Sequence, residues 1–172
     1  MFKLTSVFNC KQQKGAALIV ALVFLLIMTM IGATAMQSTT QQEKMAGNTR
    51  QRNLAFQAAE AALRDGEGIL QQATLPTFDG STAGLIQPMV PTTEIGTFWM
   101  GYNWTQSQTY SDTLDEVSAQ PSYVIEELPR VAISGGSVKF GPLPEAGLYR
   151  VTARGLGGTT DAIVILQTTY RR

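Results

Sequence analysis

The sequence predicts an α+β fold in which one long N-terminal helix packs on a C-terminal antiparallel β-sheet. Three observations lead to this prediction. An uncharged apolar run covers Gly15 to Met36, a polar but strongly helix-forming stretch without proline follows it, and two segments near the end of the chain have the pattern of strands. The roughly 135 residues after the apolar run suffice for one modest core and are too few for two domains.

The apolar run follows a basic leader, residues 1–15, that contains three lysines and no acidic residue. As a helix the run is about 30 Å long, which matches the hydrocarbon core of a bilayer. A secretory signal peptide has a shorter apolar core with small residues after it. Here the small residues, Gly15 to Ala17, precede the run, so cleavage there would leave the apolar helix on the mature chain. Residues 16–36 are therefore predicted to span the membrane as the first half of the long helix.

Composition argues against an enzyme. The chain has no histidine, and its only cysteine, Cys10, lies in the leader. The usual zinc, iron and copper ligands and the Ser–His and Cys–His nucleophile pairs are therefore missing, so we expect no catalytic residue, no metal site and no cofactor. Removing the leader leaves ten basic against 13 acidic residues, because three of the 13 bases lie there. A mature chain with net charge −3 has no general attraction for nucleic acid.

The second half of the helix, residues 37–73, is predicted to be amphipathic. Apolar residues recur there at helical spacing, with smaller alanines beside them. The residues expected to pack on the sheet are Ala55, Phe56, Ala59 and Leu63, with Leu70 further along. The opposite side carries charges, among which Glu60 and Arg64 have the spacing of a helical ion pair.

Residues 74–172 are predicted to form a globular β-rich domain, which begins where Pro76 ends the helix. An aromatic run at 97–104 has the composition of a strand. Together with Tyr110 its rings could form a ligand-binding or adhesive surface, but packing on a sheet face is the favoured interpretation. The aromatic residues concerned are Phe98, Trp99, Tyr102, Trp104 and Tyr110.

The later strands are better defined. Ser122 to Leu128 is predicted to be a strand that ends before Pro129, and Gly135-Gly136 to turn the chain into a short strand at 138–140. Leu148 to Arg154 alternates, so that Tyr149, Val151 and Ala153 share one face. A turn at 155–158 then leads to a return strand at 162–170, whose first half is apolar on both faces. Such a strand is expected in the centre of the sheet, covered by the helix.

These features resemble a type IV prepilin. The matching residues are Lys14-Gly15 and then Ala16-Ala17-Leu18-Ile19-Val20 with the apolar run behind them. The stretches 41–48 and 52–64, and the closing segments 149–155 and 168–172, are similar to the PilX group of minor pilins. The resemblance implies a pilin-like fold. It also implies that a dedicated prepilin peptidase cuts between Gly15 and Ala16, after which Ala16 is N-methylated and the helix start, with Leu18, Ile19 and Val20, packs in the filament core.

One residue departs from the family pattern. Most pilins carry a glutamate at the fifth position of the mature helix, where its charge pairs with the N-terminal amine of a neighbouring subunit, and here that position is Val20. The valine avoids the cost of burying a carboxylate but leaves that amine without its partner. A subunit of this kind fits the top of a filament. The tip-like subunit of type II secretion pseudopili has the same substitution.

The resemblance implies a minor pilin that primes or caps pilus assembly and so supports twitching motility and surface attachment. Its partners would be other minor pilins, the major pilin, the prepilin peptidase and the inner membrane, with a tip adhesin as a further candidate. Before assembly the protein would be held in a bacterial inner membrane with its C-terminal domain in the periplasm, and afterwards it would lie in the pilus at the cell surface. Two alternatives remain open, a tip-exposed adhesion module and a minor pseudopilin of a type II secretion system.

Overall fold

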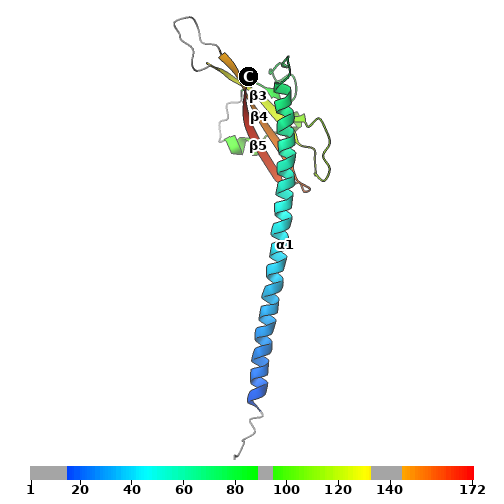
Figure 1. Ribbon diagram of the computed structural model, residues 1–172, viewed down its shortest axis with the longest axis vertical. Helices are drawn as coiled ribbons and strands as arrows, with labels where there is room; N and C mark the ends of the chain where they lie inside the picture. The colour runs from blue at the N-terminus through cyan, green and yellow to red at the C-terminus, as the bar shows by residue number, and fades with distance from the viewer. Residues whose placement is uncertain (1–14, 89–94, 133–144) are drawn as a thin grey trace, which may run out of the picture. The chain divides into compact units, whose positions relative to one another are not determined.

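The computed structural model of the protein describes residues 15–88, 95–132 and 145–172 (Figure 1). The chain divides into two compact units, Met1–Ala46 and Gly47–Arg172. The predicted α+β class is confirmed, because one long helix is followed by a five-stranded sheet within the second unit.

The long helix, α1, covers Ala16–Leu70 and continues through Gly32 and Gly47. No proline interrupts it, since the first proline is Pro76. In the first unit every described residue of α1 is exposed, whereas in the second unit one side of the helix is buried. The packed face of the helix lies in the second unit and has Ala55 as its first buried residue, whereas residues 37–50 are exposed.

Three long antiparallel strands make up most of the sheet. The strand order is β1-β3-β4-β5, and β2 also pairs with β3. The strands are β1 Leu85–Ile86, β2 Gln108–Thr109, β3 Ser122–Ala132, β4 Glu145–Leu156 and β5 Ile163–Arg171. The sheet is mixed rather than purely antiparallel, because the short β1 runs parallel to β3. Strand β3 also continues through Pro129, where the pairing with β4 shifts register between Leu128 and Val131, so the proline is accommodated by an irregularity. The turn and strand expected at 135–140 lie outside the described residues.

The prediction that residues 97–104 form a strand is wrong. The chain forms a short helix, α2 Ile95–Met100, and then a 3₁₀ turn, η1 Trp104–Gln106. In a strand, successive rings would point to opposite faces. The helical turns instead bring the rings of Trp99, Tyr102 and Trp104 together, with centroids 5.0 to 5.8 Å apart. Aromatic packing therefore overrides the strand propensity of these residues.

The prediction that the last strand lies in the centre of the sheet is also wrong. Strand β5 is an edge strand among the described residues, and β4 is the strand with long neighbours on both sides. The expected turn begins later, because Gly155 and Leu156 continue β4 and pair with Val164 and Ile163. The apolar residues of β5 are half-buried or exposed, so they are not explained by a central position.

The two faces of the sheet have different covers. Tyr149, Val151 and Ala153 point toward α1 and belong to the main hydrophobic core, with Leu70 of the helix. Thr152 and Arg154 point to the other face, where α2 and the aromatic cluster lie. Figure 1 shows the sheet between α1 and α2.

Candidate assembly segment and helix–sheet interface

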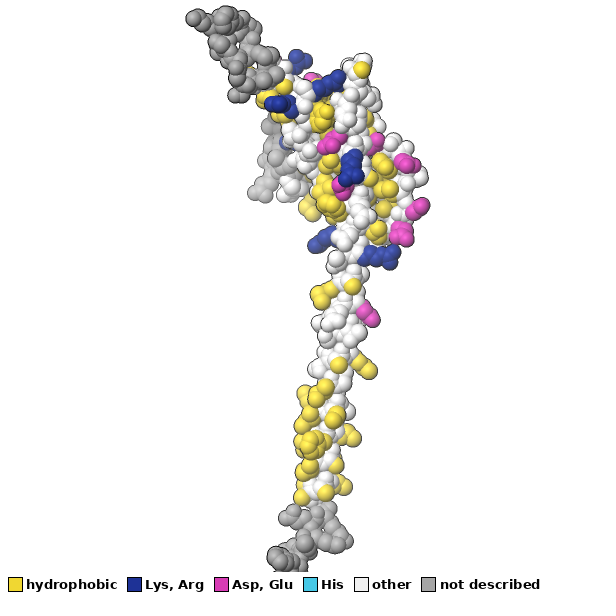
Figure 2. All heavy atoms as spheres, viewed as in Figure 1, with side chains coloured by type: hydrophobic (Ala, Val, Ile, Leu, Met, Phe, Trp, Pro, Cys, Tyr) yellow, Lys and Arg dark blue, Asp and Glu magenta, His cyan; other side chains and the backbone are white. Residues whose placement is uncertain are grey.

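The expected assembly residues lie at the beginning of α1. Gly15 immediately precedes the helix, Ala16 is its first residue, and the side chains of Leu18, Ile19 and Val20 are all exposed. The apolar side chains continue along α1 to Met36, and Figure 2 shows them gathered on the lower part of the helix. A helix exposed in this way needs an apolar surrounding, either lipid or other helices. Residues 1–14 of the leader lie outside the described residues.

The polar side chains of the helix are also compatible with a lipid environment, because their hydroxyl groups are hydrogen-bonded within the helix. Hydroxyl-bearing residues within the apolar segment donate to backbone carbonyls one turn earlier, as Thr29 does to Leu26 at 2.7 Å and Thr34 to Ile31 at 2.9 Å. These bonds satisfy the hydroxyl groups where no water is available. By length and composition α1 contains one segment able to cross a membrane.

The packed face of α1 consists of small residues. Ala55, Ala58, Ala59 and Ala62 are at most 1 % exposed, while Leu63 is half-buried against the core. Their spacing places them on one stripe of the helix. Phe56 lies beside this stripe, and its side chain is 47 % exposed, so the expectation that it covers the sheet is wrong.

The reason for the small residues is the closeness of helix and strand. A Cβ atom added at Gly155 of β4 would lie 2.2 Å from the carbonyl oxygen of Ala55 and 2.3 Å from the backbone nitrogen of Ala59. The two backbones therefore approach as closely as a glycine permits, and a phenylalanine has no room between them. The sequence predicts a turn at Gly155, but the residue continues β4 and pairs with Val164. Its position in the alternating pattern, directly after Arg154, was the signal for close backbone approach.

Polar contacts hold the loop before β3 to the same helix. The carboxylate of Asp65 accepts hydrogen bonds from the backbone N–H of Ser111 at 3.0 Å and from its hydroxyl at 2.9 Å.

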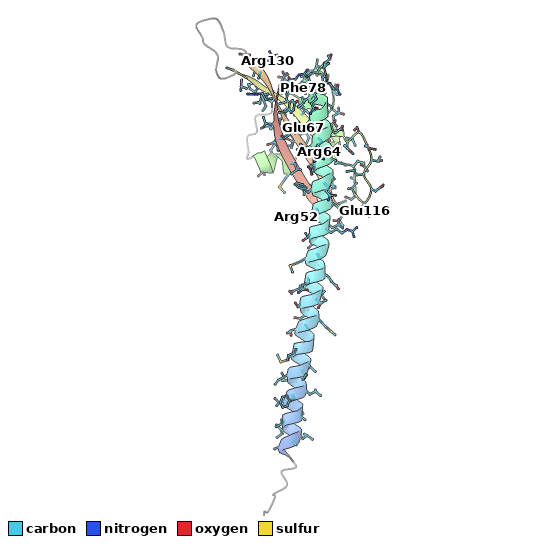
Figure 3. All side chains as sticks on the ribbon, in the orientation of Figure 1. Arg52, Arg64, Glu67, Phe78, Glu116 and Arg130 are labelled. Carbon is cyan, nitrogen blue, oxygen red and sulfur yellow. The ribbon has the colours of Figure 1, made fainter. Side chains whose placement is uncertain are left out.

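Asp65 also lies near Tyr123 of β3. Burial of the Tyr123 ring, with a smaller contribution from Asp65, raises the pKa of Tyr123 well above its usual value. One turn earlier on the helix, Glu60 and Arg64 form the expected ion pair. Nearer the N-terminus of the helix, a guanidinium nitrogen of Arg50 lies 3.2 Å from a carboxylate oxygen of Glu116 in the loop. Figure 3 shows Glu116 beside α1.

A buried ion pair occupies the other face of the sheet. Glu126 of β3 is fully buried and accepts two hydrogen bonds from the guanidinium group of Arg150, at 2.5 and 2.7 Å. The hydrogen bond to Glu126 raises the pKa of Arg150. Paired in this way the two charges need no external ligand, so this cluster is structural.

Beside this ion pair the aromatic cluster borders an open hollow of about 510 Å³. Trp99, Trp104 and Tyr102 form one side, and β4 and β5 form the other. Tyr110 makes no ring contact with the cluster in the described part of the chain. The rings therefore pack on the sheet, as favoured from the sequence, and also line a cavity. Among the described residues, no group of three or more potential metal ligands occurs.

Comparison with known proteins identifies the N-terminal segment. The family model PilX N-terminal matches residues 14–64, which confirms the resemblance to the PilX group over the apolar segment and the adjoining part of the packed helix. The match covers residues 14–64 and is to the N-terminal part of PilX-type pilins, so the likeness concerns the apolar segment and the first part of the packed helix. No curated protein and no solved structure matches the chain.

Proposed function

From the PilX-type segment at its N-terminus, we propose that the protein is a minor pilin that helps to prime or cap a type IV pilus, and so supports twitching motility and surface attachment. The observation that carries the proposal is the combination of this segment with the apolar residues 16–36 of α1, which are all exposed. Such a helix can lie in the inner membrane before assembly and among other pilin helices afterwards. The second unit would then face the periplasm and, after assembly, the outside.

The proposal includes processing between Gly15 and Ala16. Gly15 has open space around it, since a Cβ there would meet no atom within 4 Å. The fold therefore does not require a glycine at this position, and we expect that the peptidase does. We expect Gly15→Val to leave the protein uncleaved and otherwise folded. Mass spectrometry of the membrane-derived protein should give an N-methylated Ala16 for the wild type and an intact leader for the variant. A wild-type chain that still begins at residue 1 or 2 would contradict the assignment.

Val20 bears on the place of the subunit in the filament. A carboxylate at this exposed position of α1 is costly in the membrane unless an amine lies within reach. A subunit at the tip has no neighbour above it to supply that amine, so Val20→Glu should assemble no better than wild type. The measurement is the ratio of this protein to the major pilin in sheared pili, with Val23→Glu as a control for the general cost of a charge in the segment.

A few copies per filament are expected for the wild type. Abundant wild-type protein that increases further with Val20→Glu would place the subunit along the shaft instead. The pilus family match supports the pilus over a secretion pseudopilus as the assembly. A role limited to adhesion is distinguished by whether pili form without the protein.

A further inference from the structure

The outer edge of β5 has a row of backbone groups that no described strand pairs with. The nitrogen of Gly157 donates to the Ala162 carbonyl at 2.8 Å, and the nitrogen of Arg172 donates to the Gly147 carbonyl at 2.9 Å. The register between these two points is continuous. Because the direction of hydrogen bonding alternates along a strand, the even-numbered residues of β5 bond to β4. The odd-numbered residues, Ile163 to Thr169, direct their N–H and C=O groups to the outer edge.

This edge lacks the features that usually prevent pairing with another chain. Natural edge strands are blocked by lysine, proline, a bulge or short length. Strand β5 has nine residues, contains no proline, and has no charged residue before Arg171. Its pairing with β4 shows no register shift. A strand of this kind is available for the addition of a further strand.

The hollow under α2 borders the same strand. The side chains of Ile163, Ile165 and Gln167 line it, and these are the odd-numbered residues whose backbone groups face outward. Met100, which is 83 % exposed, lies on the opposite side of the hollow. Alternate side chains of a strand added to β5 would therefore lie at the mouth of a cavity with apolar and aromatic walls.

The charge in the hollow indicates what the added strand must carry. Arg154 lies with its guanidinium carbon 5.7 Å from the ring centre of Trp104. Among the described residues no carboxylate forms a salt bridge with it. A carboxylate on the added strand would complement this cation. A second copy of β5 cannot supply one, because the segment from Ile163 to Arg171 contains no acidic residue.

We propose that β5 and the adjoining hollow bind an extended segment of another protein by strand addition. The segment has apolar side chains at alternate positions and one carboxylate on the same face, opposite Arg154. The backbone of β5 would supply affinity and the hollow would supply specificity. This inference is independent of the proposed role in pilus assembly.

The test uses the full-length protein in detergent micelles and synthetic peptides of nine residues, the length of β5. The probe is acetyl-TVTETVTVT-amide, in which valines and the glutamate share one face. One control replaces its glutamate with glutamine, and a second is N-methylated at two consecutive central residues, which removes one donor from each edge. Hydrogen exchange is measured residue by residue along β5.

At a peptide concentration ten times the Kd, exchange of the outward amides of Ile163, Ile165 and Gln167 should slow about elevenfold. The glutamine peptide should bind about two- to fivefold more weakly, as expected for a partly exposed ion pair. The protein variant Arg154→Gln should bind both peptides equally. The N-methylated peptide should give no protection at these amides.

Three results would overturn the proposal. Equal binding of the N-methylated peptide would show that the hollow binds side chains without strand addition. Absence of protection at saturating probe would show that the edge is closed. Protection of the same amides in the protein alone, increasing with protein concentration, would show that a second copy occupies the edge.

Discussion

At the scale of single residues, two glycines of α1 with different surroundings test the helix–sheet contact. A Cβ at Gly66 would lie 2.8 Å from a methyl group of Val151 and 3.0 Å from the ring of Tyr123, whereas a Cβ at Gly68 would meet nothing within 4 Å. Gly68→Ala should stabilise the second unit by about 1 kcal/mol through helix propensity. Gly66→Ala gains the same propensity but crowds the core, at a cost of about 1–3 kcal/mol.

Urea unfolding of a chain that begins near Gln41, without the apolar segment, measures both changes. The pair is matched, since both glycines lie in the last turns of the same helix. Equal stabilisation by the two alanines would mean that α1 stands farther from β4 than the structure places it.

Residue patterns predicted which side of the helix packs on the sheet but not how closely the helix and the sheet approach. The alanines and Leu63 lie on that face, and the ion pair of Glu60 and Arg64 forms on the outside. The prediction included Phe56 because its helical spacing places it close to Ala59 and Leu63. Close approach at Gly155 leaves no room for that side chain, and the approach depends on a strand far away in the sequence. No local pattern on the helix contains this information.

At the scale of elements, the end of α1 is held by a residue from the other end of the chain. The guanidinium group of Arg172 donates to the carbonyl of Leu70 at 3.2 Å and to that of Ala73 at 3.3 Å. Carbonyls at a helix C-terminus have no partner within the helix, and a cation there is favourable. Arg172→Ala should therefore destabilise the second unit by about 1 kcal/mol.

The control for this prediction is Arg171→Ala, which removes an exposed neighbouring cation from the end of β5. Thermal unfolding of the two variants compares them directly. An equal loss in both, or none in Arg172→Ala, would indicate that the hydrogen bonds to the helix end contribute nothing measurable.

Elements were predictable where periodicity and packing agree. The long helix, β3 and β4 follow from their sequence patterns, although the middle of β3 and of β4 is buried on both faces. The aromatic run and β5 show the limit. Their composition favours a strand and a central position, but the rings gather around the second face of the sheet and β5 stays at the edge. The position of the rings and that of β5 both depend on how α1 and α2 cover the two faces of the sheet, which local sequence patterns do not contain.

At the scale of the whole molecule, the chain joins two units with different requirements. The described residues of the first unit form a helix with no protein cover, and the second unit has its own core. The first is suited to lipid or to a bundle of pilin helices, and the second folds around its sheet. The proposed minor pilin would need both, and the PilX N-terminal match covers most of the helix that runs through the two units.

The central claim is that pilus formation requires this protein. Electron microscopy of a deletion strain, with surface pili counted per cell, tests it most directly. We expect few or no pili in the deletion strain, restoration by the wild-type gene, and no restoration by Gly15→Val, whose uncleaved leader blocks assembly. A deletion strain with normal numbers of pili and a defect only in attachment would contradict this account and assign the protein to adhesion.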